Sequence, residues 1–153
     1  AVKLSTLLYI KFNLKVEKPK TKMIITSKRD YPLTKNFPYS LEHLQASYCK
    51  LARIDTRVLC LKKLRKLDLS HNHIKQLPAT IGDLVFLQEL NLHDNHLETF
   101  SSLDHLRFLS AARNKLPFLP SDFRKLCLES LDLFGNPFEQ PNPLVPNIQL
   151  KIP

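Results

Sequence analysis

The sequence contains little glycine and cysteine: two glycines and three cysteines among 153 residues. Two glycines cannot build a glycine-rich phosphate-binding loop, which excludes nucleotide-binding folds of that kind. No run of about 18 apolar residues occurs, so no segment is expected to span a membrane. No Ser–His–Asp or Cys–His arrangement suggests nucleophilic catalysis. We therefore expect a protein that is not an enzyme and that uses no cofactor.

The cysteines Cys49, Cys60 and Cys127 are odd in number and widely separated, and no cysteine-rich cap occurs. This usage is typical of small buried hydrophobic residues in a reducing compartment. The sequence begins AVKLSTLLYIKFNLK, with no initiator methionine and with early lysines, which does not resemble a signal peptide. We expect an intracellular protein and a piece of a longer one.

Leucine, by contrast, is abundant and periodic. Residues 64–77 read LRKLDLSHNHIKQL and residues 87–100 read LQELNLHDNHLETF, with Asn72 and Asn95 in the same place. This is the LxxLxLxxNxL signature of leucine-rich repeats, and its 23-residue period lies within the usual range of about 20–29. The sequence predicts an α/β repeat fold: a leucine-rich repeat solenoid with a curved parallel sheet and an irregular or short-helical convex side.

Three weaker units extend the array to about five. An asparagine at this position is expected to bond backbone groups of the turn and to stack from coil to coil, and cysteine is an accepted alternative. The predicted structural ladder is Cys49, Asn72, Asn95, Asn114 and Asn136.

One spacing in the ladder is short. Asn95 and Asn114 are 19 residues apart, whereas Asn114 and Asn136 are 22 apart. Either this coil is tight, or whole repeats are missing between Phe100 and Leu103 through splicing or a closed gap. We favour missing repeats.

The pattern divides the chain into a β-strand segment (1–40), the repeats (41–140) and a proline-rich C-terminal extension (141–153). The β-branched, aromatic and leucine residues of 2–16, which alternate with polar ones over 9–16, and the apolar run 23–26 predict strands. These strands either end an N-terminal β domain or cap the solenoid. Residues 1–40 hold nine basic and two acidic residues, a net charge of +7. Their lysines are either the solvated face of a hairpin, which we favour, or a surface for nucleic acid, an acidic protein or a membrane.

The outward residues of the strands and turns form the concave face, which is the natural contact surface of a solenoid. Aromatic side chains beside charges suit a protein interface. Residues just after the second leucine, namely Ser47, Ser70, His93, Ala112 and Phe134, are expected to face outward with the rest. The predicted protein-binding residues are Lys66, Asp68, His71, Glu89, Asn91, His93, Asp94, Phe108, Ser110, Arg113, Asp132 and Phe134.

Histidines gather at positions 71, 73, 93 and 96. Stacking of repeats should bring His71 near Asp94 and His73 over His96, about one strand spacing of 4.8 Å apart. Zinc needs three or four converging ligands, and these side chains are expected to spread over the concave edge and the turn. We predict no metal site.

Three longer stretches carry a closer resemblance: KMIITSKRDYPLTKNFPYSLEHLQASYCKL, LCLKKLRKLDLSHNHIKQLPATIGDL and LRFLSAARNKLPFLPSDFRKL. They resemble the leucine-rich repeat substrate receptors of cullin-2 RING ubiquitin ligases, specifically over residues 21–140. The resemblance implies a pleckstrin-homology-like domain, then the repeats, then a box that binds elongin B, elongin C and cullin-2. This chain ends before that box, and the family carries extra repeats at the 19-residue coil.

The same resemblance implies a nuclear function. The repeats would recruit the replicative helicase (CMG, through an Mcm subunit) for ubiquitylation and replisome disassembly at the termination of replication. The alternative is a nucleic-acid-binding or general scaffold module that uses the basic segment 1–40. A steep fall of affinity with salt would distinguish that alternative.

Overall fold

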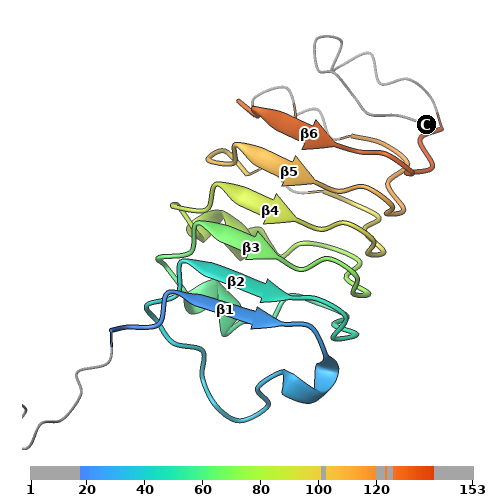
Figure 1. The fold of residues 1–153 in the computed structure, drawn as a ribbon. Coiled ribbons are helices and arrows are strands. Elements are labelled where there is room, and N and C mark those ends of the chain that lie inside the picture. Colours follow the sequence, from blue (N-terminus) through green and yellow to red (C-terminus); the bar gives the residue numbers. More distant parts are fainter. Residues whose placement is uncertain (1–17, 101–102, 120–122, 124–125, 140–153) are drawn as a thin grey trace, which may run out of the picture.

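The structure is a computed structural model, and it describes residues 18–100, 103–119, 123 and 126–139. Six parallel strands form one sheet in the order β1 to β6 (Figure 1). The strands are β1 (Lys22–Ile25), β2 (His43–Ala46), β3 (Lys66–Asp68), β4 (Glu89–Asn91), β5 (Phe108–Ser110) and β6 (Ser130–Asp132). The connections contain the 3-10 helices η1 (Lys28–Asp30), η2 (Val58–Cys60) and η3 (Ala79–Asp83). The predicted leucine-rich repeat solenoid is confirmed.

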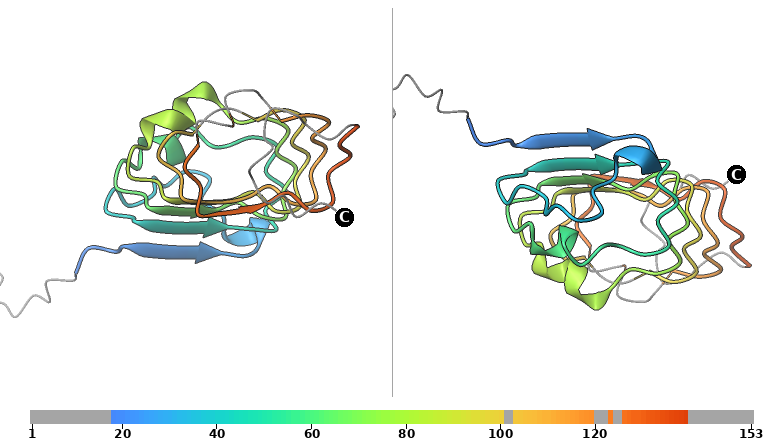
Figure 2. Two further views of the ribbon diagram at one scale, coloured as in Figure 1. Left: turned by 90° about the horizontal axis from the view of Figure 1, so that it is seen from above. Right: turned by 90° about the horizontal axis from the view of Figure 1, so that it is seen from below.

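The register of the sheet places equivalent leucines in rows. Leu44, Leu67, Leu90, Leu109 and Leu131 pair successively across β2 to β6, and all are buried. Each coil has the sheet on one side and returns around the core on the other sides (Figure 2). Because one coil cannot bury its own leucines, each depends on its neighbours for a continuous core.

The sheet begins earlier than residue 41, the predicted start of the repeats. Strand β1 pairs with β2 in parallel, with Lys22 opposite His43 and Ile25 opposite Ala46. Residues 22–25 therefore form the first strand of the solenoid sheet, because Ile25 occupies the place of a repeat's second inward residue. The predicted strand in 2–16 and the extension 141–153 lie outside the described residues.

The 19-residue coil does not interrupt the sheet. Strands β4 and β5 pair in register, with Leu90 opposite Leu109. The Leu92 amide donates to the Ser110 carbonyl at 2.7 Å, as in the longer coils. The shortening therefore lies in the convex connection, which leaves the spacing of the strands unchanged. No helix in the described ranges is long and apolar enough to cross a bilayer.

Candidate functional site

The twelve residues predicted to bind a protein lie on strands β3 to β6 and on the turns that follow them. None of the twelve is buried. The register brings them into rows: Lys66 lies opposite Glu89, and Glu89 opposite Phe108. A surface that spans several coils is therefore assembled from residues about 20 positions apart. That this surface binds a partner stays a prediction.

The outward residues of β3 to β6 surround a shallow hollow of about 340 Å³. Seven of the twelve predicted residues line it: Lys66, Asp68, Glu89, Asn91, Phe108, Ser110 and Asp132. Lys66 and Glu89, which lie opposite each other on β3 and β4, form an ion pair at 3.4 Å. The half-buried Phe108 ring has the Arg107 guanidinium 5.7 Å from its centroid. The hollow thus combines an aromatic surface with fixed charges, as protein-contact surfaces do.

His43, the first residue of β2, is uncharged near pH 7. Burial, and then the nearby Lys66 and Lys22, lower the pKa of His43. A lower pKa means that the imidazole is uncharged at neutral pH. The N-terminal end of the concave face therefore presents lysines rather than a charged histidine.

Three of the predicted contact residues also hold the backbone. The Asp68 carboxylate accepts a hydrogen bond from the Ser70 amide at 3.0 Å, and Asn91 and Asp132 do the same for the second residue after each. Such short acceptors stabilise the bend at the end of a strand. This role was missed in the sequence, although an Asp or Asn between the two leucines is a recognisable signal for it.

The turn after each of the strands β2 to β6 contains a residue with a left-handed backbone. The φ angles are 58° at Tyr48, 57° at His71, 54° at Asp94, 55° at Arg113 and 77° at Gly135. Glycine adopts this conformation freely, and Asp or His tolerates it, whereas Tyr and Arg do so at a cost of about 1 kcal/mol or more. The backbone conformation therefore does not account for the bulky side chains at Tyr48 and Arg113, because glycine would adopt it with less strain.

Side chains on these turns contact one another from coil to coil. The Tyr48 and His71 rings stack with centroids 4.5 Å apart, and His71 Nδ1 lies 2.9 Å from Asp94 Oδ2. The Arg113 guanidinium lies 5.9 Å from the centroid of the Phe134 ring. These turns form an aromatic and charged rim beside the hollow. Tyr48, which the sequence places in the same outward column as His71 and Arg113 but which is not among the twelve predicted residues, belongs to this rim.

The third outward column was predicted wrongly. Ser47, Ser70 and Ala112 are buried, with 1%, 6% and 1% of their surface exposed. Only the larger His93 and Phe134 in this column reach the surface. The chain is already bending toward the turn here, so a small side chain fits beneath the next coil and a large one is pushed outward.

The asparagine ladder lies beneath the rim and fixes it. Asn72 Nδ2 donates to the Ala46 carbonyl at 2.8 Å, and Asn72 Oδ1 accepts from the Cys49 amide at 3.0 Å. Asn95, Asn114 and Asn136 likewise donate to a carbonyl of the preceding coil. At the first position Cys49 is buried, which raises the pKa of its thiol, and its Sγ lies 3.2 Å from the Ser47 carbonyl oxygen of its own coil. The ladder therefore ends at Cys49.

The histidines lie as the repeat spacing implies. The rings of His73 and His96 have centroids 5.0 Å apart on the turn, and His71 and His93 meet edge to face at 5.4 Å. Within the described ranges no group of three or more His, Cys, Asp or Glu residues is placed to hold a metal ion.

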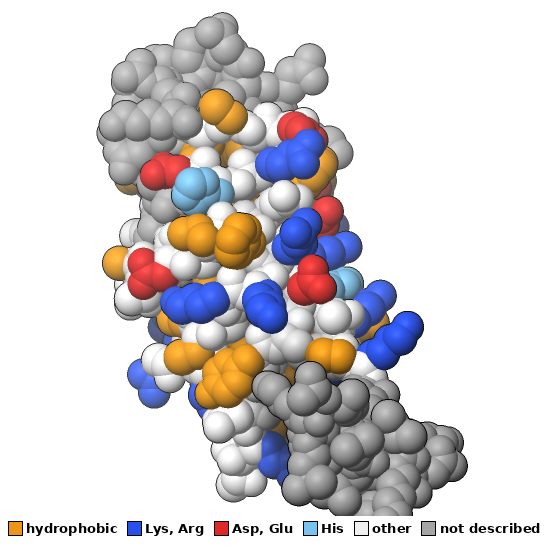
Figure 3. All heavy atoms as spheres, turned by 90° about the vertical axis from the view of Figure 1, so that its left-hand side faces the viewer, with side chains coloured by type: hydrophobic (Ala, Val, Ile, Leu, Met, Phe, Trp, Pro, Cys, Tyr) orange, Lys and Arg blue, Asp and Glu red, His pale blue; other side chains and the backbone are white. Residues whose placement is uncertain are grey.

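The flank where the chain enters the strands carries exposed hydrophobic side chains among charged ones (Figure 3). Tyr39, Val85 and Phe86 are exposed on these entering segments. Arg65 pairs with Glu42 of the preceding coil at 3.5 Å, whereas Arg107 pairs with Glu129 of the following coil. Sequence reasoning did not single out this flank, because its exposed residues break rather than follow the leucine period.

The N-terminal segment is tied to the first repeat by a cluster that sequence reasoning also missed. Arg57 bonds the Asp55 carboxylate, and its guanidinium donates to the Pro32 carbonyl at 2.7 Å. The same guanidinium lies 5.1 Å from the Phe37 ring centroid, and Tyr31 donates to Asp55 at 2.9 Å. These contacts hold residues 31–37 against the coil that begins the repeats.

Comparison with known proteins gives consistent relatives. The family model for leucine-rich repeats in two copies matches residues 39–79 and 62–105. Leucine-rich repeat protein 1 of Homo sapiens is 55% identical over 88% of this chain and 45% of its own length. The Mus musculus protein of that name is 53% identical over 98% of this chain and 48% of its own length. A solved leucine-rich repeat protein of Leptospira interrogans has a TM-score of 0.65 and 33% identity, covering 70% of this chain and 29% of that one.

The relatives are longer in two respects. The chain spans about half the length of the curated relatives that it matches. The alignment with the mouse protein also extends over 203 positions, although this chain has only 153 residues, so about 50 positions of that relative have no counterpart here. That length is about two repeats of 23 residues. The location of missing repeats at 100–103 stays a prediction.

Proposed function

Because the chain is a leucine-rich repeat solenoid homologous to leucine-rich repeat protein 1, we propose that it is the substrate-recognition part of a cullin-2 ubiquitin ligase receptor. The repeat fold and the homology make the chain a protein-interaction module. In the proposal, the concave face docks the replicative helicase. Elongin B, elongin C and cullin-2 bind a segment outside these 153 residues. Recognition of the helicase would take place in the nucleus.

The observation that carries the proposal is the concave face itself. Phe108 offers half-buried aromatic area in the hollow, and Arg113 presents a planar guanidinium on the adjacent rim. Aromatic and arginine side chains are the usual anchors of protein interfaces. The left-handed backbone at Arg113 adds weight, because the fold would be served better there by glycine.

The test is capture of the helicase complex from nuclear extract by the full-length protein that carries this sequence. Replacing Phe108 and Arg113 together with Ala should weaken capture about tenfold or more, since each interface anchor typically contributes about 1 kcal/mol or more. Phe118 and Lys115, replaced with Ala, form the matched control: an exposed aromatic and a cation that lie outside the hollow. Circular dichroism checks that each variant is folded.

The opposing variant is Lys11→Glu with Lys15→Glu in the basic segment. Unchanged capture by the Phe108 and Arg113 variant, together with lost capture by the lysine variant, would show that the concave face is the wrong surface. The ligase part is tested separately, by copurification of elongin B, elongin C and cullin-2. We expect the full-length protein to retain them and the 153-residue chain to lose them.

A further inference from the structure

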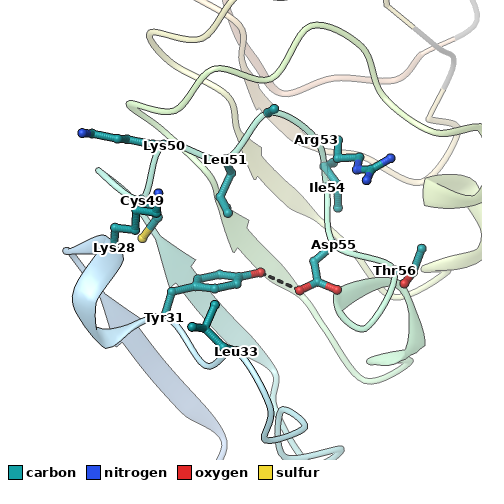
Figure 4. Close-up of a pocket in the computed structure, with 11 residues that line it drawn as sticks. Lys28, Tyr31, Leu33, Cys49, Lys50, Leu51, Arg53, Ile54, Asp55 and Thr56 are labelled. Atoms are coloured by element: carbon teal, nitrogen blue, oxygen red, sulfur yellow. Dashed lines mark hydrogen bonds between the residues drawn. The ribbon is translucent and has the colours of Figure 1, made fainter.

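A second hollow, of about 660 Å³, lies at the N-terminal end of the solenoid, away from the concave face. It is bounded by η1, by the segment that follows η1, and by the turn of the first repeat (Figure 4). Its apolar walls are Tyr31, Leu51 and Ile54, of which Ile54 is buried and the other two are half-buried. Leu33, 86% exposed, stands at the same pocket. A volume of this size is within the range of about 300–1,000 Å³ typical of ligand sites.

The lining of the pocket carries a net positive charge. Lys28, Lys50 and Arg53 line it, and none of them takes part in the ion pairs found among the described residues. Asp55 is the only acidic residue of the lining, and it is already engaged. Its carboxylate accepts from Arg57 Nε at 2.9 Å and from the Tyr31 hydroxyl at 2.9 Å. The three cations therefore lack an internal partner from the pocket wall.

The cations lie at both ends of the pocket. In Figure 4, Lys28 and Lys50 stand at one end and Arg53 at the other, with the apolar side chains between them. A compact anion would reach only one end. An extended chain with carboxylates on either side of an apolar residue would reach both ends.

The backbone at Lys50 is a second, independent sign. Its φ of 55° is left-handed, whereas the equivalent residues of the following coils, His73, His96 and Lys115, are not among the residues with positive φ. The bend is held from both sides, because the Cys49 and Leu51 amides both donate to Asn72 Oδ1, at 3.0 and 3.2 Å. Glycine would meet this geometry without strain. The lysine side chain therefore serves something other than the bend.

We propose that this pocket binds an extended acidic peptide segment of a partner protein. An apolar side chain of the peptide packs against Tyr31, Leu51 and Ile54, and its flanking carboxylates pair with Lys28, Lys50 and Arg53. Charge complementarity selects the peptide, and the apolar walls select its central residue. This surface is separate from the concave face, so the chain would contact partners at two places.

The probe is a fluorescein-labelled decapeptide with glutamates on both sides of a central Phe-Leu pair, and a matched peptide with lysines in place of the glutamates. Fluorescence anisotropy with the 153-residue chain at low salt should detect the acidic peptide and not the basic one. Arg53→Glu should weaken binding about tenfold or more. Lys50→Gly should weaken it several-fold while leaving Tm unchanged or higher, because it removes the charge and relieves the backbone.

Lys115→Glu is the matched control, since it reverses a charge on the same row of turns outside the pocket. It should bind the peptide as the unaltered chain does, and so should the double variant at Phe108 and Arg113, which separates this proposal from the concave-face proposal. No binding of the acidic peptide up to millimolar concentration would overturn the inference. The inference would also be overturned if the Lys50→Gly and Arg53→Glu variants bound the acidic peptide as tightly as the unaltered chain does. Tighter binding of an oligothymidine than of the acidic peptide, at the same residues, would overturn it as well.

Discussion

Two neighbouring asparagines of the ladder should differ in their contribution to stability, because the structure gives them different numbers of dependent groups. Asn95 Oδ1 accepts from the Ile74 amide at 3.1 Å, and its Nδ2 donates to the carbonyls of Leu69 and Leu92. Those two carbonyls also accept from Asn72 and Asn114, respectively. Replacing Asn95 with Ala therefore orphans one buried amide, at a cost of about 1–3 kcal/mol.

Asn72 supports more. It accepts from two amides, those of Cys49 and Leu51, and it donates to the Ala46 carbonyl. The side chain of Cys49, one coil earlier, has no amide group that could also donate to the Ala46 carbonyl. We expect Asn72→Ala to cost about twice as much as Asn95→Ala, roughly 2–5 kcal/mol on the same scale of buried unpaired groups.

Urea unfolding of the 153-residue chain measures both variants, with Leu90→Ala as a reference for the loss of a buried leucine, about 2–5 kcal/mol. The expected order places Asn95→Ala as the mildest of the three. If Asn95→Ala proves as costly as Asn72→Ala or Leu90→Ala, then the sharing of carbonyls along the ladder does not protect its middle members, and the reasoning is wrong.

Three further predictions concern the N-terminal cluster and the last turn. Burial raises the pKa of Asp55, but hydrogen bonds from Arg57 outweigh burial, so the pKa is lowered overall. The cluster should therefore lose stability as the pH falls below about 4. The Asp55→Asn variant should show a smaller loss of Tm at acid pH in thermal melts. Burial, and then the hydrogen bond to Asp55, raise the pKa of Tyr31 above 10.0, so stability should fall as pH rises past 10.0, and Tyr31→Phe should remove the latest phenolate step in absorbance at high pH. Gly135→Ala should cost about 1 kcal/mol or more, because φ is 77° and the new Cβ would lie 3.2 Å from Arg113 Cγ, whereas Gly82→Ala, with nothing within 4 Å, is the neutral control in thermal melts.

The fold and much of the concave face follow from the sequence because two periods act together. The alternation of a strand decides which residue faces outward, and the coil length decides which residues become neighbours. The pairing of His71 with Asp94, 23 residues apart, is read directly from these two periods, and the structure places them 2.9 Å apart.

What the sequence did not reveal lies where neither period applies. Ser47 and Ser70 are buried because the chain bends at the end of each strand, and alternation says nothing about a bend. The cluster of Tyr31, Asp55 and Arg57 joins an irregular segment to the first coil, with no repeat to indicate which residues meet. The pocket lined by Tyr31, Leu51 and Ile54 could not be predicted from the sequence for the same reason.

The direction of the asparagine ladder has a consequence for how the chain is made. Each asparagine supplies the acceptor for an amide in the coil before it, as Asn95 does for Ile74 and Asn114 does for Leu97. A coil that has just left the ribosome therefore still has an exposed amide in its turn, and it stays incomplete until the next coil arrives. Folding during synthesis should run one repeat behind translation, with the newest turn always the one most open to proteases and chaperones.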